Sequence, residues 1–270
     1  MNLEAVKRRA FVCCPFDWLV ERYLPLLAAE GIQPEIGLDA GLLHRYRWPT
    51  FRRVARRLRA AGLGCTVHAP FTDLPLGAAD PEIRRVAARR LSQALRVAGE
   101  LGARSMVVHT GFDPRHHGGD LHRWREAALE VLGVLAGAAA ASGVPLMLEN
   151  VFEHDPALHR FLLDALPAPG VGFCLDLGHQ VVFSRTPARE WLEALGDRLG
   201  QLHLHDNRGR NDDHLAVGEG ILDFDGLFAW LAAHGRRPIL TLEPHAESAV
   251  RPALEGLGRL LDRFPSVAPA

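Results

Sequence analysis

Two stretches decide the fold, Gly172-Phe-Cys-Leu-Asp-Leu-Gly-His179 and Gln201-Leu-His-Leu-His-Asp-Asn207. Each begins as a short apolar run, which is typical of a buried parallel strand, and ends in acidic or imidazole side chains. The segment between them predicts a helix that begins at Thr186-Pro187, because proline is favoured at the first helical position. The pattern is strand, helix, strand, with reactive side chains where the strands end.

The same pattern recurs along the whole chain. Residues 81–101, for example, have helical spacing and start at Asp80-Pro81, a favourable helix start. Eight strand–helix units in 270 residues, without a linker between them, predict one α/β domain over residues 1–270, a (β/α)₈ or TIM barrel. The predicted strands are residues 10–14, 34–38, 65–68, 105–109, 146–149, 172–175, 201–205 and 239–242.

The composition is that of a soluble globular protein, and the formal net charge of −1 does not attract nucleic acid or a membrane surface. Lys7 is the only lysine, so Schiff-base and P-loop chemistry are disfavoured and no nucleotide cofactor is expected. Four cysteines in apolar runs, without a CxxC pair, indicate buried thiols of a cytoplasmic protein. The uncharged residues 131–148 contain Gly143 and Pro145, which predicts a helix end, a turn and a strand instead of a membrane span.

Side chains that can bind metal lie at seven of the eight predicted strand ends. The strands of a TIM barrel end at one mouth, where its catalytic groups lie, so we expect these side chains to meet. One histidine or carboxylate at a strand end is usually a cap or a structural group, but seven coincidences are a poor explanation, and we predict a divalent-metal site. These residues are Glu35, His68, His109, Glu149, Asp176 with His179, His203 with His205, and Glu243; the loop after the seventh strand adds Asp212 and His214.

The mixture of ligands narrows the identity of the metal. Imidazoles with carboxylates favour zinc, manganese, iron or cobalt over calcium or magnesium. The candidates outnumber the positions around one ion. Either some of them bind substrate or orient ligands, or the site holds two or three ions.

Seven motifs follow in order: His68-Ala-Pro-Phe71, Val108-His-Thr-Gly111, Leu148-Glu-Asn150, Cys174-Leu-Asp-Leu-Gly-His179, Leu202-His-Leu-His-Asp-Asn207, Asp212-Asp-His214 with Gly218-Glu-Gly220, and Leu242-Glu-Pro244. Together they resemble the xylose isomerase-like TIM barrels, a superfamily of sugar isomerases and epimerases that also holds the DNA-repair enzyme endonuclease IV. The match covers most of the chain. Single motifs are weak, but the ordered set is specific.

The resemblance to the sugar isomerases and epimerases implies one divalent ion, Zn²⁺ or Mn²⁺, held by Glu149, Asp176, His203 and Glu243. Glu149 and Glu243 would be the catalytic pair that moves a proton between adjacent carbons, or off and onto one carbon, of a sugar or sugar phosphate. The residues expected to contact substrate are Glu35, Glu153, His179, His205 and Arg208.

The resemblance to endonuclease IV implies a larger ligand set for three zinc ions, which suits hydrolysis of a phosphate ester. The Asp212 and His214 pair distinguishes the two functions, since a single-ion isomerase has no obvious use for it. The alternative interpretation is that Asp212 and His214 belong to a polar loop that binds a sugar. The predicted metal ligands are His68, His109, Glu149, Asp176, His179, His203, Asp212, His214 and Glu243.

We rank an isomerase or epimerase first, because the segment around Glu153 is more similar to sugar-isomerase members than to endonuclease IV. A zinc phosphoesterase, with abasic DNA as one candidate substrate, ranks second, and a barrel that only binds metal is not favoured. The expected partner is a small sugar or sugar phosphate; nucleic acid is not favoured, no membrane is expected, and the oligomeric state is left open. Residues 45–48 form the one basic and aromatic cluster near the mouth. We interpret it as the solvated start of a helix with Tyr46 and Trp48 packed beneath it. The alternative is a segment that wedges into a DNA duplex or binds a substrate phosphate.

Overall fold

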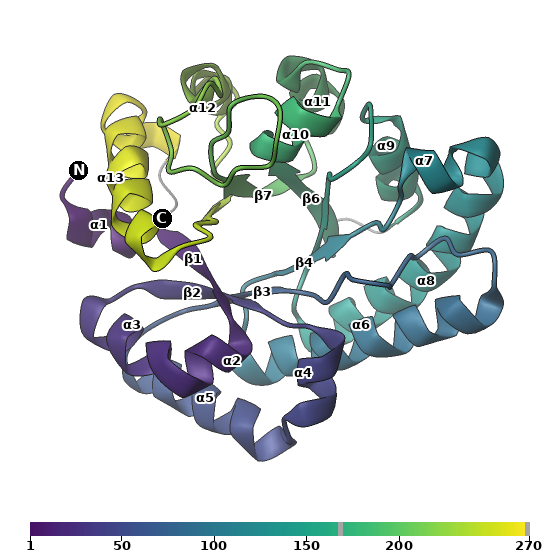
Figure 1. Ribbon diagram of the computed structural model, residues 1–270, viewed down its shortest axis with the longest axis horizontal. Coiled ribbons are helices and arrows are strands. Elements are labelled where there is room, and N and C mark those ends of the chain that lie inside the picture. Colours follow the sequence, from purple (N-terminus) through teal and green to yellow (C-terminus); the bar gives the residue numbers. More distant parts are fainter. Residues whose placement is uncertain (167–169, 268–270) are drawn as a thin grey trace.

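The computed structural model describes residues 1–166 and 170–267 and shows a closed barrel of eight parallel strands, with helices around it (Figure 1). Each strand pairs with the next, and β1 pairs with β8 to close the barrel. The predicted TIM barrel is confirmed, and the strand ends differ from the prediction by no more than two residues. The strands are β1 (Ala10–Pro15), β2 (Gln33–Gly37), β3 (Thr66–His68), β4 (Met106–His109), β5 (Leu146–Glu149), β6 (Val171–Asp176), β7 (Leu199–Leu204) and β8 (Ile239–Leu242).

The helices differ greatly in length. The long ones are α5 (Trp48–Ala60), α6 (Pro81–Leu101), α8 (Leu121–Ser142) and α13 (Glu247–Arg263). The short ones are α1 (Leu3–Lys7), α2 (Phe16–Trp18), α3 (Leu24–Glu30), α4 (Ala40–Arg45), α7 (Pro114–His117), α9 (Ala157–Ala165), α10 (Leu177–Phe183), α11 (Ala188–Leu195) and α12 (Phe224–Ala233). A π-helical turn at Leu19–Tyr23 joins α2 to α3, and 3₁₀ turns lie at Gly118–Asp120 and Pro265–Val267.

Local sequence signals set the ends of several elements. The Asp80 side chain accepts a hydrogen bond from the Glu82 N–H and caps α6, which begins at Pro81 as predicted. The helix predicted from Thr186-Pro187 is α11, and Pro187 is its N-cap. The uncharged residues 131–148 are the end of α8, a turn and β5, as expected. No helix in the described part of the chain has both the length and the apolar character needed to cross a bilayer.

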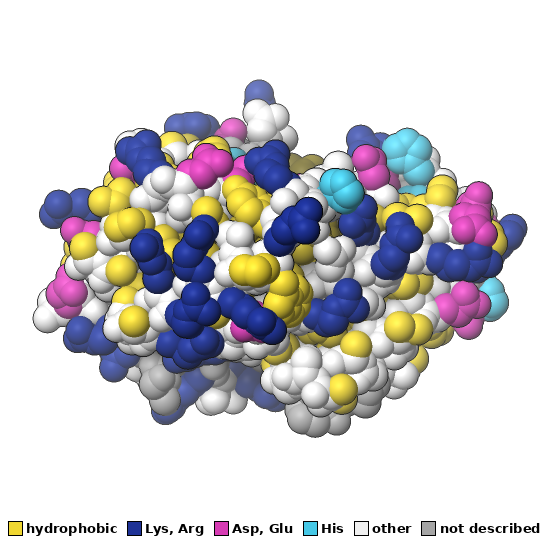
Figure 2. Space-filling view, turned by 90° about the horizontal axis from the view of Figure 1, so that it is seen from below, with side chains coloured by type: hydrophobic (Ala, Val, Ile, Leu, Met, Phe, Trp, Pro, Cys, Tyr) yellow, Lys and Arg dark blue, Asp and Glu magenta, His cyan; other side chains and the backbone are white. Residues whose placement is uncertain are grey.

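Helix α5 has five arginines and no acidic residue, and its apolar residues, among them Phe51 and Leu58, are buried. Tyr46 packs against Phe16 with ring centroids 5.3 Å apart, and Trp48 packs against Phe51 at 6.0 Å. This confirms that the two aromatic residues lie beneath the start of the helix. Figure 2 shows the face that includes α5, on which arginine side chains dominate and acidic ones lie mainly toward the edges.

The inside of the barrel is partly apolar and partly polar. Val107, Met147 and Cys174 form a small apolar cluster that is separate from the large core between strands and helices.

All four cysteines are free thiols, as expected, but Cys13 is only partly buried, which corrects the expectation for that residue. Cys13 lies beside Glu35 of β2 in the sheet, and burial together with the nearby carboxylates of Glu243 and Glu35 raises the pKa of its thiol.

Candidate metal centre

The predicted ligands meet at the carboxyl ends of the strands in overlapping sets, which we treat as three groups; two further sets, Asp176 with His205 and Glu243, and Glu35 with His203 and Glu243, connect them. The His109 group is His68, His109 and Glu149; the His203 group is Glu149, Asp176, His203 and Glu243; the Asp212 group is His179, His205, Asp212 and His214. In the His109 and Asp212 groups, and among Glu149, Asp176 and His203, the donor atoms all lie within 4.8 Å of one another. Glu243 joins the His203 group through Nδ1 of His203, which is 3.1 Å from Oε1 of Glu243. Each group has the donors of a transition-metal site.

Glu149 links the first two groups. Its Oε2 lies 3.2 Å from Nε2 of His68 and 2.9 Å from Nε2 of His109. Its Oε1 lies 3.0 Å from Nδ1 of His203. Because each oxygen of the carboxylate faces a different group, Glu149 is placed to bridge two ions.

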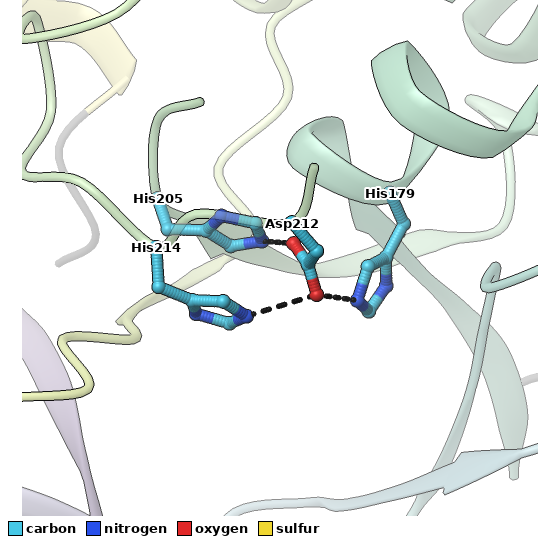
Figure 3. Close-up of side chains that lie close together, drawn as sticks. All are labelled: His179, His205, Asp212 and His214. Carbon is cyan, nitrogen blue, oxygen red and sulfur yellow. Dashed lines mark hydrogen bonds and ion pairs between the residues drawn. The ribbon is translucent and has the colours of Figure 1, made fainter. Parts of the chain in front are cut away.

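Asp212 is the centre of the third group (Figure 3). Its Oδ2 lies 3.3 Å from Nε2 of His179 and 3.2 Å from Nε2 of His214. Its Oδ1 is 3.7 Å from Nε2 of His205 and is buried without a hydrogen-bond partner among the described residues. An orphaned buried carboxylate oxygen among three imidazoles fits a cation.

Asp206 holds the loop that carries Asp212 and His214. Its Oδ2 accepts hydrogen bonds from the N–H groups of Gly218 (3.0 Å) and Gly220 (2.8 Å). Its backbone forms two 2.8 Å hydrogen bonds with Leu215. Asp206 therefore ties the backbone of this loop.

Backbone carbonyls orient three of the histidines. Nδ1 of His68 lies 2.9 Å from the Ala69 carbonyl, Nδ1 of His179 lies 3.0 Å from that of Asn150, and Nδ1 of His214 lies 2.8 Å from that of Glu243. A carbonyl only accepts, so Nδ1 must carry the proton in each ring. In the neutral rings, Nε2 then presents a lone pair toward carboxylate oxygens. Such a pairing requires a proton or a cation between the two atoms, and the donor set fits a divalent cation.

The site concentrates buried negative charge. Within residues 1–166 and 170–267, the carboxylates of Glu149, Asp176, Asp212 and Glu243 form ion pairs only with histidines. Burial alone would raise the pKa of Glu149, but His203 and His109 hold that pKa well below its usual value. Burial alone would lower the pKa of His203, but the acidic groups around it hold that pKa well above its usual value. In the ion-free site, imidazole protons would thus balance the carboxylate charges, and divalent ions would replace those protons.

Glu35 lies elsewhere than the sequence suggested. We expected it near the mouth in contact with substrate, but it sits in the middle of β2 and its carboxylate is fully buried beneath His203. Position 35 faces inward two residues before the strand ends, so side chains at the mouth cover it. The substrate contact predicted for Glu35 is therefore corrected.

The other predicted substrate contacts have different surroundings. The buried carboxylate of Glu153 accepts hydrogen bonds from the Thr110 hydroxyl and from the Val151 N–H. Arg208 is exposed in the loop after β7. His179 and His205 both lie in the Asp212 group, so their donor atoms can serve as ligands. Substrate contacts of these four residues remain predictions.

Sequence reasoning gave no role to two further residues. His159 on α9 is fully buried, and its Nε2 lies 3.1 Å from the carbonyl oxygen of Glu149. Phe71 is 51% exposed and stacks on His109, with ring centroids 4.5 Å apart. The HAPF motif, which ends in Phe71, could have indicated that Phe71 lies at the site. For His159, which lies within an amphipathic helix, the sequence offers no such signal.

The fold and the site define the family. Residues 29–264 match the xylose isomerase-like TIM barrel, and the chain belongs to that family, which confirms the resemblance. A probable endonuclease 4 of Mycobacterium tuberculosis is 30% identical over 226 residues, which cover 78% of this chain and 86% of that protein.

Solved structures share the fold. The TTHB071 protein of Thermus thermophilus, from a crystal soaked with ZnCl₂, has 34% identity and a TM-score of 0.80 over 94% of this chain and 98% of that one. A D-psicose 3-epimerase from Clostridium cellulolyticum H10 has 17% identity and a TM-score of 0.74 over 96% of this chain and 100% of that one. This second likeness shows the fold alone.

Proposed function

We propose that this protein is a metal-dependent hydrolase of phosphate esters that holds two or three divalent ions, with zinc as the first candidate. The observation that supports this proposal is the complete Asp212 group, which lies beside the two groups that share Glu149. Proton transfer in an isomerase needs one ion, for which the His203 group suffices. The third group therefore reverses the ranking drawn from the sequence. The 30% identical relative named as a probable endonuclease 4 supports the same proposal.

When bound, the ions would supply activation of a water molecule and neutralisation of charge on the phosphoryl oxygens. The chain supplies fixed geometry. Glu149 holds the His109 and His203 groups at a set spacing, because its two oxygens face both. The loop tied by Asp206 holds Asp212 and His214 beside them. Positive charge placed in advance around one phosphoryl group is electrostatic preorganisation, which is commonly the largest contribution to catalysis.

A sugar isomerase or epimerase is the second candidate. It is favoured by the convergence of Glu149 and Glu243, whose Oε1 atoms lie 3.0 and 3.1 Å from Nδ1 of His203. Two carboxylates that converge on one ligand can flank a small substrate and exchange a proton with it. This function requires one ion and incorporates solvent deuterium into the sugar.

Elemental analysis of the zinc-reconstituted protein, combined with assays on both substrate classes, tests the proposal. We expect two or three ions per chain and hydrolysis of bis-p-nitrophenyl phosphate, p-nitrophenyl phosphate or an abasic DNA duplex. The Asp212→Asn variant should lose one ion and at least about 100-fold in hydrolysis, by the scale of other electrostatic contributions. Asp213→Asn is the matched control, because the Asp213 carboxylate accepts only from the Arg208 N–H among the described residues and lies outside the three groups. One ion per chain, no hydrolysis, and deuterium in a sugar product would replace the proposal with the second candidate.

A further inference from the structure

A polar layer lies inside the barrel directly below the metal centre. Glu35 is at its centre and is fully buried, as are Thr66, Gln201 and Thr241 around it. The Ser105 hydroxyl donates to Oε1 of Gln201 at 2.6 Å, which turns the Gln201 amide nitrogen toward Glu35. A buried carboxylate is costly unless its partners are well placed, so this layer needs an explanation.

The two oxygens of Glu35 have different partners. Oε2 accepts from the Thr66 hydroxyl at 2.7 Å, the Gln201 amide at 2.6 Å and the Thr241 hydroxyl at 3.2 Å. Oε1 lies 3.0 Å from Nε2 of His203. This contact is short but imperfectly aligned, and Oε1 has no other partner among the described residues. Three donors therefore fix the carboxylate and leave one oxygen for His203.

His203 connects this layer to the metal centre. Its Nε2 faces Glu35, and its Nδ1 lies 3.0 Å from Glu149 and 3.1 Å from Glu243. The Gln201 amide nitrogen is also 3.4 Å from Nε2, but it is much closer to Glu35. An imidazole that binds a metal through one nitrogen carries a proton on the other, and the acceptor of that proton determines which nitrogen is free.

We propose that Glu35 is a positioning residue that keeps the proton of His203 on Nε2, so that Nδ1 is free to bind the ion shared with Glu149 and Asp176. The inference rests on the metal centre of the proposed function. It concerns where the ring proton resides and not which reaction follows.

The Glu35→Gln substitution should reverse this arrangement. The three donors that converge on Oε2 favour the amide oxygen of glutamine at that position. The amide NH₂ then faces Nε2 of His203, which must become the acceptor, and the ring proton moves to Nδ1. The variant is nearly isosteric, yet it should deprive the His203 group of a ligand.

Zinc titration against a chromogenic chelator, with ¹H–¹⁵N NMR of the imidazoles, tests the proposal without an activity assay. Glu35→Gln should bind one zinc ion about 10 to 100 times more weakly, as other losses of ligand-orienting groups do. Glu30→Gln is the matched control, since it makes the same chemical change at a carboxylate that pairs with Lys7 and lies outside this layer; it should bind zinc as the wild type does. The zinc-loaded wild type should show a slowly exchanging N–H on Nε2 of His203, assigned by its absence in His203→Gln.

Equal zinc affinity in Glu35→Gln and the wild type would overturn the proposal. So would a wild-type proton on Nδ1, a result that stands even if the variant does not fold. Both outcomes leave the proposed hydrolase intact. A protein that binds one zinc ion tightly, keeps the proton on Nε2 and does not hydrolyse phosphate esters would refute the hydrolase and leave this inference standing.

Discussion

Glu149 contacts two of the ligand groups at once. It is 1% exposed at the end of β5, and its two oxygens face different histidine groups. His159 contacts its backbone carbonyl from α9, and the neighbouring Asn150 exchanges two 2.9 Å hydrogen bonds with the backbone of Asp176. The Glu149 carboxylate is therefore held from several sides.

The Glu149→Gln substitution should remove more metal than any other single change of ligand. The amide keeps the shape of the side chain but loses the charge and one acceptor, so both groups that share Glu149 are weakened. We expect at most one ion per chain by elemental analysis, retained by the Asp212 group, while Asp212→Asn loses only one. Loss of a single ion in both variants would argue against a bridging role for Glu149.

His214 has a backbone φ of +49°, which is unusual for a residue other than glycine. Such a conformation persists only when its surroundings impose it. Here the Asp206–Leu215 bridge and the Asp212 group lie on either side of it. The strain is located in the loop that presents two predicted ligands.

Among the structural elements, the loop of residues 207–220 depends on one buried carboxylate. The Asp206→Ala substitution leaves the buried N–H groups of Asn207 and Leu222, and the less buried ones of Gly218 and Gly220, without this acceptor, at a cost of about 2–4 kcal/mol in the free energy of unfolding. The substitution touches no predicted ligand, yet it should release one zinc ion because the loop no longer holds Asp212 and His214. Urea unfolding and elemental analysis measure the two effects. Full metal content in a destabilised variant would show that the ligands hold the loop unaided.

Helix α5 carries like charges at neighbouring positions on its exposed face. Arg53 lies three and four residues before Arg56 and Arg57, and Arg52 has the only ion pair of these arginines within the described residues, 3.5 Å from Glu100. Arg53→Glu replaces repulsion by attraction and should raise the free energy of unfolding by about 0.5–1 kcal/mol at low salt. Arg53→Gln should give about half of this. Urea unfolding at low and high salt is the measurement, and a gain that persists in high salt would exclude the electrostatic explanation.

For the molecule as a whole, a rise in pH should lower the stability of the ion-free protein. The same rise should increase the stabilisation that zinc provides. In the ion-free protein, burial would lower the pKa values of the site histidines, but the neighbouring carboxylates outweigh burial in four of them. The four with raised pKa values are His68, His179, His203 and His205; His109 has a lowered value. A raised folded pKa contributes stability that is present below the unfolded value of about 6.5 and is lost as pH rises through the folded value.

The carboxylates limit stability on the acid side. Glu149, Asp176 and Asp212 have lowered pKa values, so their contribution is present above the unfolded values of about 4 and is lost as pH falls through the folded values. We expect the ion-free protein to be most stable between about pH 4.5 and 6.5. Zinc needs deprotonated ligands, so the difference in Tm between the zinc-loaded and EDTA-treated protein should widen from about pH 6 to 8. A difference that does not change with pH would contradict the proposed ligand set.

The sequence by itself determined the eight-stranded barrel and most of the side chains that gather at its mouth. Apolar runs with regular spacing predict buried parallel strands, and a closed parallel barrel brings the ends of its strands to one mouth. The ordered motifs from His68 to Glu243 were therefore sufficient to predict which histidines and carboxylates cluster there. Asp80 and Pro81 likewise predicted the start of α6, because capping is a local interaction.

Only the tertiary structure decided which of these residues contact one another, and through which atoms. Which oxygen of Glu149 faces which histidine depends on side-chain contacts between strands that are far apart in the sequence. For the same reason, Glu35 proved to lie beneath His203 instead of contacting substrate, and His205 lies beside Asp212. The alternation of side chains along a strand predicts only that a given side chain points into the barrel. The depth at which it lies and the nitrogen or oxygen that faces it are set by packing across the barrel.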